Sequence, residues 1–194
     1  MTGVSSKISS TDMGEMGVQS PDVQLILITG GPGTGKSSVA KALYCGLPER
    51  WALVNLDGLW SLRIAGASGD NWESYRQSVQ LRAGVLQFYS SDGRPVIAEG
   101  IVQRDELREY QVATRTDAPP RRLVFVNLTC STAESVRRMT SRDANYGRLT
   151  KPASDHERHF NGLTSRVDAR GATSVEVEGK TIQEIVKAIL DLTR

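Results

Sequence analysis

The sequence predicts an α/β fold of three layers, in which a parallel β-sheet lies between two layers of helices. From residue 23 to the end, short apolar runs typical of strands alternate with longer segments of helical periodicity. Strands that alternate with helices form parallel sheets covered on both faces. The chain has 194 residues, of which 39% are hydrophobic and 24% charged. This length and composition favour one globular domain with a sizeable core, over residues 23–194.

The first half of the chain contains one segment without a pattern and four segments with one. Residues 1–22 are rich in Ser, Thr, Gly and Asp, and we expect them to form a disordered tail. The patterned segments are a buried strand over residues 24–29, a helix over 36–45, a second strand over 51–56 and a long helix over 72–89. The long helix has one apolar face, formed by Trp72, Tyr75, Val79, Leu86 and Tyr89.

The second half continues the alternation. It contains a third strand over residues 95–98, a polar helix near 105–114, a fourth strand over 123–128 and a fifth strand over 174–177. Three pairs match the capping-box pattern of helix starts: Ser131 with Glu134, Ser154 with Glu157, and Thr181 with Glu184. The last helix is expected to bury an apolar stripe of Ile182, Ile185, Val186, Ile189 and Leu190.

Charge and hydropathy exclude several classes of protein. The 24 basic and 22 acidic side chains give a net charge of +2, which argues against a general nucleic-acid or membrane-surface binder. The longest apolar runs, such as residues 25–28, have four residues, whereas a membrane-spanning helix needs about 20. The first residues lack the apolar segment of a signal peptide, so we expect a cytoplasmic protein. Cys45 and Cys130 are too few for a disulfide framework and are expected to be buried.

Residues 30–37 read GGPGTGKS and match the phosphate-binding pattern G-x-x-x-x-G-K-[ST] in full. The pattern lies where it must, between a buried strand and a helix. Glycines let the backbone direct several N–H groups at phosphate oxygens, and the helix N-terminus adds a favourable dipole. Lys36 is expected to reach the β- and γ-phosphates, and the Ser37 hydroxyl to coordinate Mg²⁺. The predicted nucleotide-binding residues are Gly31, Pro32, Gly33, Thr34, Gly35, Lys36, Ser37 and Ser38.

Over residues 23–194 the chain resembles the small phosphate-loop kinases, which include nucleoside monophosphate, shikimate and gluconate kinases and the chloramphenicol phosphotransferases. The loop at 30–37 carries the resemblance, together with acidic residues at two strand ends and an Arg-rich stretch after the fourth strand. The run Leu47-Pro48-Glu49 with Trp51 is similar to that of the chloramphenicol phosphotransferases. The resemblance implies a P-loop NTPase fold with strand order 2-3-1-4-5. It also implies Mg²⁺-dependent transfer of the ATP γ-phosphoryl group to a small acceptor.

Two carboxylates follow neighbouring strands at the edge of the sheet where the phosphate loop lies. The resemblance implies that Asp57 is the catalytic base that takes the proton of the acceptor hydroxyl. The alternative is a turn or helix cap, because Asp57-Gly58 is a turn signal. Glu99 resembles the acidic residue that holds Mg²⁺ through water. Many relatives have Asp there, so Glu99 is also a candidate for substrate contact or an ordinary strand-end carboxylate.

Residues 137–170 hold eight basic and four acidic side chains. The turn-rich segment at 143–153 resembles the short lid that closes over ATP. The resemblance places Arg137 or Arg138 beside the adenine, and Arg142 and Arg148 beside the phosphates, with Arg142 as the catalytic arginine. Any one of these arginines could instead lie on a solvated helix face. Gly179 and Lys180 match the adenine-side loop of the relatives; a plain strand–helix turn is the alternative.

The acceptor, a small molecule, is the partner that the sequence identifies least well. Arg63 and Arg104 are candidate acceptor-binding residues. His156 and His159 lack the further ligands that a metal site needs, so we assign them no metal. No oligomeric state is predicted.

Two other functions stay open. Glu99-Gly100 with Arg104 partly matches the Asp-Gly-x-x-x-Arg segment of nucleotide acceptor sites, which would indicate a nucleoside, nucleotide or polynucleotide-end kinase. A nucleotide-dependent switch or ATPase without an acceptor is the third possibility. The Asn-Lys-x-Asp motif of GTPases does not occur in the sequence.

Overall fold

A computed structural model describes residues 23–47, 50–59, 72–103, 106–114, 122–145, 151–167 and 169–194. The expected tail at residues 1–22 and the candidate residues Arg63, Arg104 and Arg148 lie outside these ranges. In the part of the chain that is described, no helix is both long and apolar enough to cross a membrane.

The strands form one five-stranded sheet in the order β2-β3-β1-β4-β5, and every neighbouring pair is parallel. This confirms the predicted fold class and strand order. All eight residues of the central strand are buried, as expected for a parallel strand covered on both faces. The strands are β1 (Val23–Gly30), β2 (Ala52–Asn55), β3 (Val96–Glu99), β4 (Arg122–Thr129) and β5 (Thr173–Glu176).

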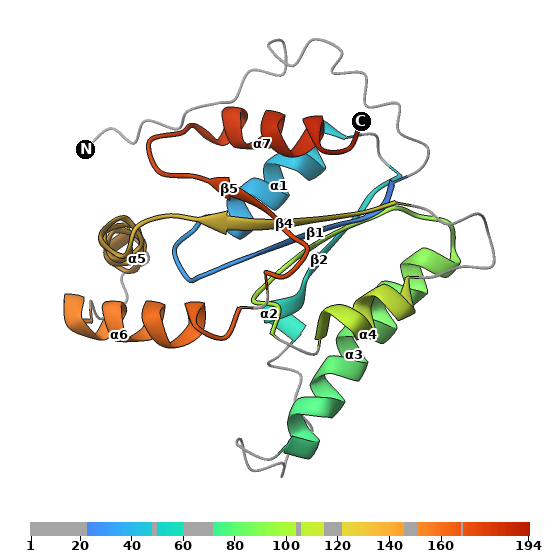
Figure 1. Cartoon of the computed structure of the whole chain (residues 1–194), viewed down its shortest axis with the longest axis horizontal. Helices are drawn as coiled ribbons and strands as arrows, with labels where there is room; N and C mark the ends of the chain where they lie inside the picture. Colours follow the sequence, from blue (N-terminus) through green and yellow to red (C-terminus); the bar gives the residue numbers. More distant parts are fainter. Residues whose placement is uncertain are drawn as a thin grey trace.

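Helices cover both faces of the sheet (Figure 1). On one face lie α1 (Lys36–Gly46) and α7 (Ile182–Asp191), and on the other lie α3 (Trp72–Ser91) and α4 (Glu106–Ala113). Beyond the end of β4, α5 (Thr132–Asn145) and α6 (Ala153–Thr164) pack against each other. The short helix α2 (Leu56–Leu59) follows β2 directly. The phosphate loop therefore lies at the sheet edge where β2, β3 and β4 also end.

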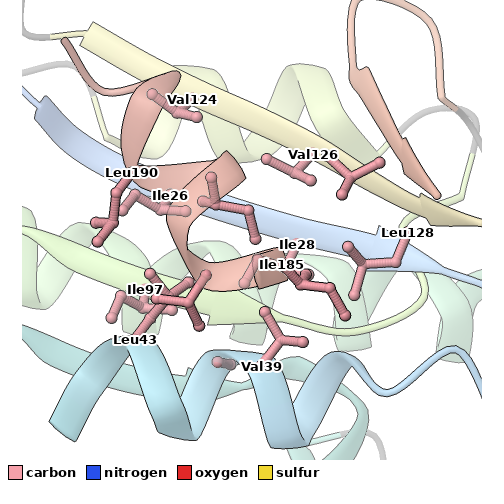
Figure 2. Packing of buried hydrophobic residues seen from close by; sticks show 14 of the residues in the cluster. Ile26, Ile28, Val39, Leu43, Ile97, Val124, Val126, Leu128, Ile185 and Leu190 are labelled. Carbon is pink, nitrogen blue, oxygen red and sulfur yellow. The ribbon is translucent and has the colours of Figure 1, made fainter. Parts of the chain in front are cut away.

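Alternate residues of β1 enter two separate apolar clusters because successive side chains of a strand point to opposite faces. Ile26 and Ile28 join the cluster under α1 and α7, whereas Leu25 and Leu27 join the one under α3 and α4. Figure 2 shows the first cluster, in which Ile185 of α7 lies with side chains of α1, β1 and β4. This apolar packing on both faces of β1 holds the loop that follows it.

The structure differs from the sequence expectations at several points. Helix α2 was not predicted, and the capping box at Ser154 and Glu157 is wrong, since α6 begins at Ala153 and Pro152 precedes it without a side-chain cap. The box at Thr181 and Glu184 is confirmed.

Four other residues also depart from expectation. At the start of α5, Ser131 Oγ accepts from Glu134 N–H, but the Ser131 amide donates to Glu178 instead of to Glu134. Neither cysteine is buried: Cys45 is exposed and Cys130 half-buried. Ile182, expected inside the apolar stripe, is 41% exposed.

Candidate active site

The phosphate loop has the backbone conformation that its glycines were expected to provide. Gly30, Gly33 and Gly35 have φ values of 145°, 75° and 92°, in the region that side chains disfavour. Lys36, the first residue of α1, folds back over the loop, and its Nζ donates to the carbonyls of Gly30 and Gly31, each at 3.1 Å. Burial lowers the pKa of Lys36, and the nearby carboxylates of Asp57 and Glu99 oppose this effect.

Two glycines of the loop are required by close packing against α5 and α6. A Cβ on Gly31 would lie 2.4 Å from Thr164 Oγ1 and 2.9 Å from Phe160 Cε2. A Cβ on Gly33 would lie 2.7 Å from the Ser135 hydroxyl, which donates a 2.6 Å hydrogen bond to the Pro32 carbonyl. The two helices after β4 therefore touch the phosphate loop itself.

A cleft of about 980 Å³ opens in front of the loop. Its walls bring together the loop residues 32–38, Asp57, Arg138, Arg142 and Lys180. Arg138 and Arg142 come from α5, Asp57 from α2 and Lys180 from the turn before α7. Sites for small molecules have volumes of roughly 300–1,000 Å³, so this cleft is at the upper end of that range. Gly31, Glu99 and Gly179 lie outside the lining residues.

The two predicted carboxylates lie at neighbouring strand ends, since Asn55 of β2 pairs with Glu99 of β3. Glu99 is 3% exposed, and its Oε1 accepts a 3.1 Å hydrogen bond from the Ser37 hydroxyl. Burial raises the pKa of Glu99, and the charge of Asp57 adds to this effect. Ser37, which lines the cleft, and the buried Glu99 behind it thus form a pair of oxygen donors that suits Mg²⁺.

Asp57 faces the cleft and is fixed by the loop after β3. Its Oδ1 accepts a 2.9 Å hydrogen bond from Ile101 N–H. The residue that caps the α2 turn is Asn55, whose Oδ1 accepts from Gly58 N–H at 2.6 Å. A Cβ on Gly100 would lie 3.0 Å from Asp57 Oδ1 and 2.9 Å from Leu56 Cβ, so only glycine allows this approach. Asp57 is therefore not the cap of its turn, and one carboxylate oxygen is held in place.

Of the two arginines expected on the adenine side, Arg138 lines the cleft. Its guanidinium donates to Glu134 at 2.6 Å, to the Val177 carbonyl at 3.2 Å and to the Thr34 carbonyl at 3.5 Å. Arg137 turns outward, with 70% of its side chain exposed, and binds the same Glu134. These hydrogen bonds from Arg137 and Arg138 lower the pKa of Glu134 to about 2. Arg138 thus links the phosphate loop to the end of β5.

Solved structures of known proteins share this fold, although no family model and no curated protein matches the chain. A gluconokinase from Sinorhizobium meliloti superposes with a TM-score of 0.62 at 21% identity, covering 89% of this chain and 92% of that one. The Mycobacterium tuberculosis APS kinase superposes with a TM-score of 0.60 at 20% identity, covering 89% of this chain and 98% of that one. The Deinococcus radiodurans tunicamycin resistance protein superposes with a TM-score of 0.58 at 18% identity, covering 87% of this chain and 94% of that one.

The chain has the fold of the small phosphate-loop kinases. Within this fold, α5 is longer than expected: it continues to Asn145, so residues 143–145 of the expected lid are helical and Arg142 lies in the last turn of α5. Residues 146–150 of that segment lie outside the described residues. Gly179 has a φ of 72° in the turn between β5 and α7, and the next residue, Lys180, lines the cleft.

Several residues that line the cleft were not among the site residues predicted from the sequence. His159 and Leu163 of α6 and Ile182 of α7 line the cleft. His159 was considered only as a metal ligand, and among the described residues no group of three or more His, Cys, Asp or Glu could hold a metal. Burial lowers the pKa of His159, with Lys151, His156 and Arg142 adding to the effect. Nothing in the sequence set Ile182 apart from its apolar stripe, and its 41% exposure is known only from the structure.

Proposed function

We propose that the chain is an ATP-dependent phosphotransferase that moves the γ-phosphoryl group of ATP to a hydroxyl group of a small molecule. One observation carries this proposal: the phosphate loop and the Asp57 carboxylate face the same cleft. A loop alone would indicate nucleotide binding. A carboxylate opposite the loop supplies the proton acceptor that an attacking hydroxyl needs.

In the proposed complex, the N–H groups of residues 31–38 and the N-terminus of α1 bind the phosphates of ATP. Lys36 exchanges its two carbonyl contacts for the β- and γ-phosphates. Arg138 and the turn at Gly179 and Lys180 hold the adenine end.

Ser37 and Glu99 are the residues that would hold Mg²⁺, which would neutralise charge on the phosphates. The hydrogen bond between their side chains places both oxygens on one side of the loop. The raised pKa of Glu99 is consistent with a buried carboxylate that a cation would stabilise in its charged form.

The transfer step follows from these positions. The acceptor oxygen attacks the γ-phosphorus, the bond from that phosphorus to the β,γ-bridging oxygen breaks, and ADP leaves with the bond's electron pair. Asp57 takes the proton of the acceptor hydroxyl on its second oxygen, since Oδ1 is held by Ile101 N–H. Lys36 and Arg142 stabilise the charge that spreads over the phosphoryl oxygens. Arg148 is expected to assist them, and Arg63 and Arg104 to bind the acceptor.

The test is a phosphotransfer screen with γ-labelled ATP against sugars, shikimate-like acids, nucleosides, nucleoside monophosphates, 5′-hydroxyl oligonucleotides and antibiotics, with one reaction lacking any acceptor. Label in a sugar, acid or antibiotic supports the proposal. Label in a nucleotide or oligonucleotide would replace it with the corresponding kinase. ATP consumption that is independent of acceptor would indicate an ATPase.

Two variants test the residue roles once an acceptor is found. Lys36→Ala should reduce turnover at least ~10²-fold, because a group that stabilises the transferred charge is lost. Asp57→Asn should retain ATP binding and reduce transfer by about 10²–10⁴-fold, because the proton acceptor is lost. Asp92→Asn is the matched control, since Asp92 is an exposed carboxylate paired with Arg94. Normal transfer by Asp57→Asn would remove the assignment of the base.

A further inference from the structure

A buried polar pair joins the last turn of α5 to the first turn of α6. Asp143 of α5 and His156 of α6 have side chains only 8% and 5% exposed, and Asp143 Oδ2 lies 3.5 Å from His156 Nε2. No residue role in the proposed phosphotransfer uses this pair.

The carboxylate of Asp143 lies where helix electrostatics and burial both disfavour it. The last turn of a helix is the negative end of its dipole, and an anion there is destabilising. Burial of a carboxylate is unfavourable unless good hydrogen bonds compensate for it. Among the described residues, the buried His156 Nε2 has no hydrogen-bond partner, and Asp143 Oδ2 faces it at 3.5 Å. A pair with such geometry contributes little to folding, so its place in the fold calls for another role.

The second oxygen of Asp143 contacts a residue of the cleft. Oδ1 lies 3.4 Å from both Nε and Nη2 of Arg142, whose side chain is 51% exposed. Arg142 and Lys36 both line the cleft, so the two cations lie at the same site. Asp143 therefore lies between a buried histidine and a cleft-facing arginine.

We propose that Asp143 and His156 are positioning residues that aim Arg142 at the γ-phosphate of bound ATP. This inference rests on the nucleotide binding in the proposed function. The guanidinium is a planar fork of five N–H donors. Contact of its Nε–Nη2 edge with Asp143 leaves Nη1 outside that contact and available to a phosphate oxygen. His156 limits the rotation of Asp143 from the opposite side and thereby limits that of Arg142.

The test is a double-mutant cycle that measures the dissociation constants of ATP and ADP by calorimetry with Mg²⁺. Wild type, Arg142→Ala, Asp143→Asn and the double variant are compared. Loss of a charge-assisted contact in Arg142→Ala should reduce the preference for ATP over ADP about tenfold. Asp143→Asn alone should reduce the preference for ATP over ADP at least ~3-fold. In the Arg142→Ala background it should cause no further reduction, because the effects of residues that act through each other are not additive.

Variants of the histidine extend the test. His156→Gln retains a polar side chain of similar reach beside Asp143 and should keep the ATP preference within about twofold of wild type, whereas His156→Leu removes this polar contact and should resemble Asp143→Asn. Asp155→Asn makes the same charge change on α6 at an ion pair with Arg158 and should leave the preference unchanged. Melting curves establish that each variant is folded at the assay temperature. If Asp143→Asn is unfolded there, the His156→Leu and Arg142→Ala pair completes the cycle.

Additive losses in the cycle, or an unchanged ATP preference in both Asp143→Asn and His156→Leu, would overturn the inference. A loss of affinity equal for ATP and ADP would also overturn it, because that result describes a structural pair. Wild-type protein that prefers ATP but labels no acceptor would refute the proposed transfer while the positioning role stands. Wild-type protein that binds no ATP would refute both.

Discussion

The most buried ion pair of the described residues lies between α3 and α4 and gives a sharp stability prediction. Arg82 Nη2 donates to Glu106 Oε1 at 2.8 Å and Nη1 donates to Oε2 at 3.3 Å, with side chains 2% and 0% exposed. Glu106 Oε2 also accepts from Gln103 N–H at 3.2 Å and from the Tyr110 hydroxyl at 3.1 Å. The carboxylate thus fixes the start of α4 directly after the loop that carries Ile101.

The perturbation is Glu106→Gln, which keeps the shape of the side chain but removes its charge. Arg82 then loses the carboxylate that it contacts at 2.8 Å, and the new amide NH₂ opposes guanidinium donors. Loss of one partner of a buried pair lowers the free energy of unfolding by about 3–5 kcal/mol. For a domain of this size each kcal/mol shifts the melting temperature by roughly 2–4 °C, so the midpoint should fall by roughly 6–20 °C.

The assay is urea unfolding followed by circular dichroism, with the double variant Arg82→Met, Glu106→Leu as comparison. Replacing both charges removes the desolvation penalty, while the two extra hydrogen bonds of Glu106 are lost at about 1 kcal/mol each. The double variant should therefore lie within about 2 kcal/mol of wild type. The reasoning fails if Glu106→Gln lowers the free energy of unfolding by less than about 1 kcal/mol. It also fails if the double variant loses as much free energy of unfolding as the single variants Arg82→Met and Glu106→Leu lose together.

Two further predictions concern Gly100 and Glu134. Gly100→Ala should leave a folded protein that binds ATP, but should reduce phosphotransfer at least ~10-fold, because the new Cβ would lie 3.0 Å from Asp57 Oδ1 and displace that carboxylate. Unchanged transfer would show that Asp57 tolerates the shift. Ile101→Val, a change at the next residue that adds no Cβ at position 100, serves as control. Glu134 has a pKa of about 2 in the folded protein against 4.5 for a free side chain, so its contribution to stability is complete above pH 4.5 and is lost as the pH falls toward 2. Wild type should lose stability over this range more steeply than Glu134→Gln, as measured by melting temperature, and parallel curves would contradict the role of this carboxylate.

Local patterns were sufficient to predict the fold and the phosphate loop. A strand buried on both faces is expected to be apolar over most of its length, and residues 25–28 of β1 form such a run. The loop pattern is contiguous, so backbone geometry alone brings its glycines and Lys36 to one place. The capping box of Thr181 and Glu184 is likewise confined to one helical turn.

The orientation of residues around a helix and the local start of a helix were less predictable from the sequence. Arg137 and Arg138 are equivalent in the sequence, but successive helix residues point about 100° apart, and only Arg138 faces the cleft. The helix start at Ala153 could not be read from Ser154, because Pro152 precedes the first turn without a side-chain cap.

Contacts between distant segments are what only the tertiary structure determined. The hydrogen bond from Ile101 N–H to Asp57, the contact of α6 with Gly31 and the pairing of His156 with Asp143 each join residues brought together by packing. No local pattern encodes them, because the register of one helix against another depends on the whole core. The sequence by itself determined the phosphate-loop pattern and its place between β1 and α1. Which side chains surround that loop was decided by how α2, α5 and α6 pack around the sheet edge.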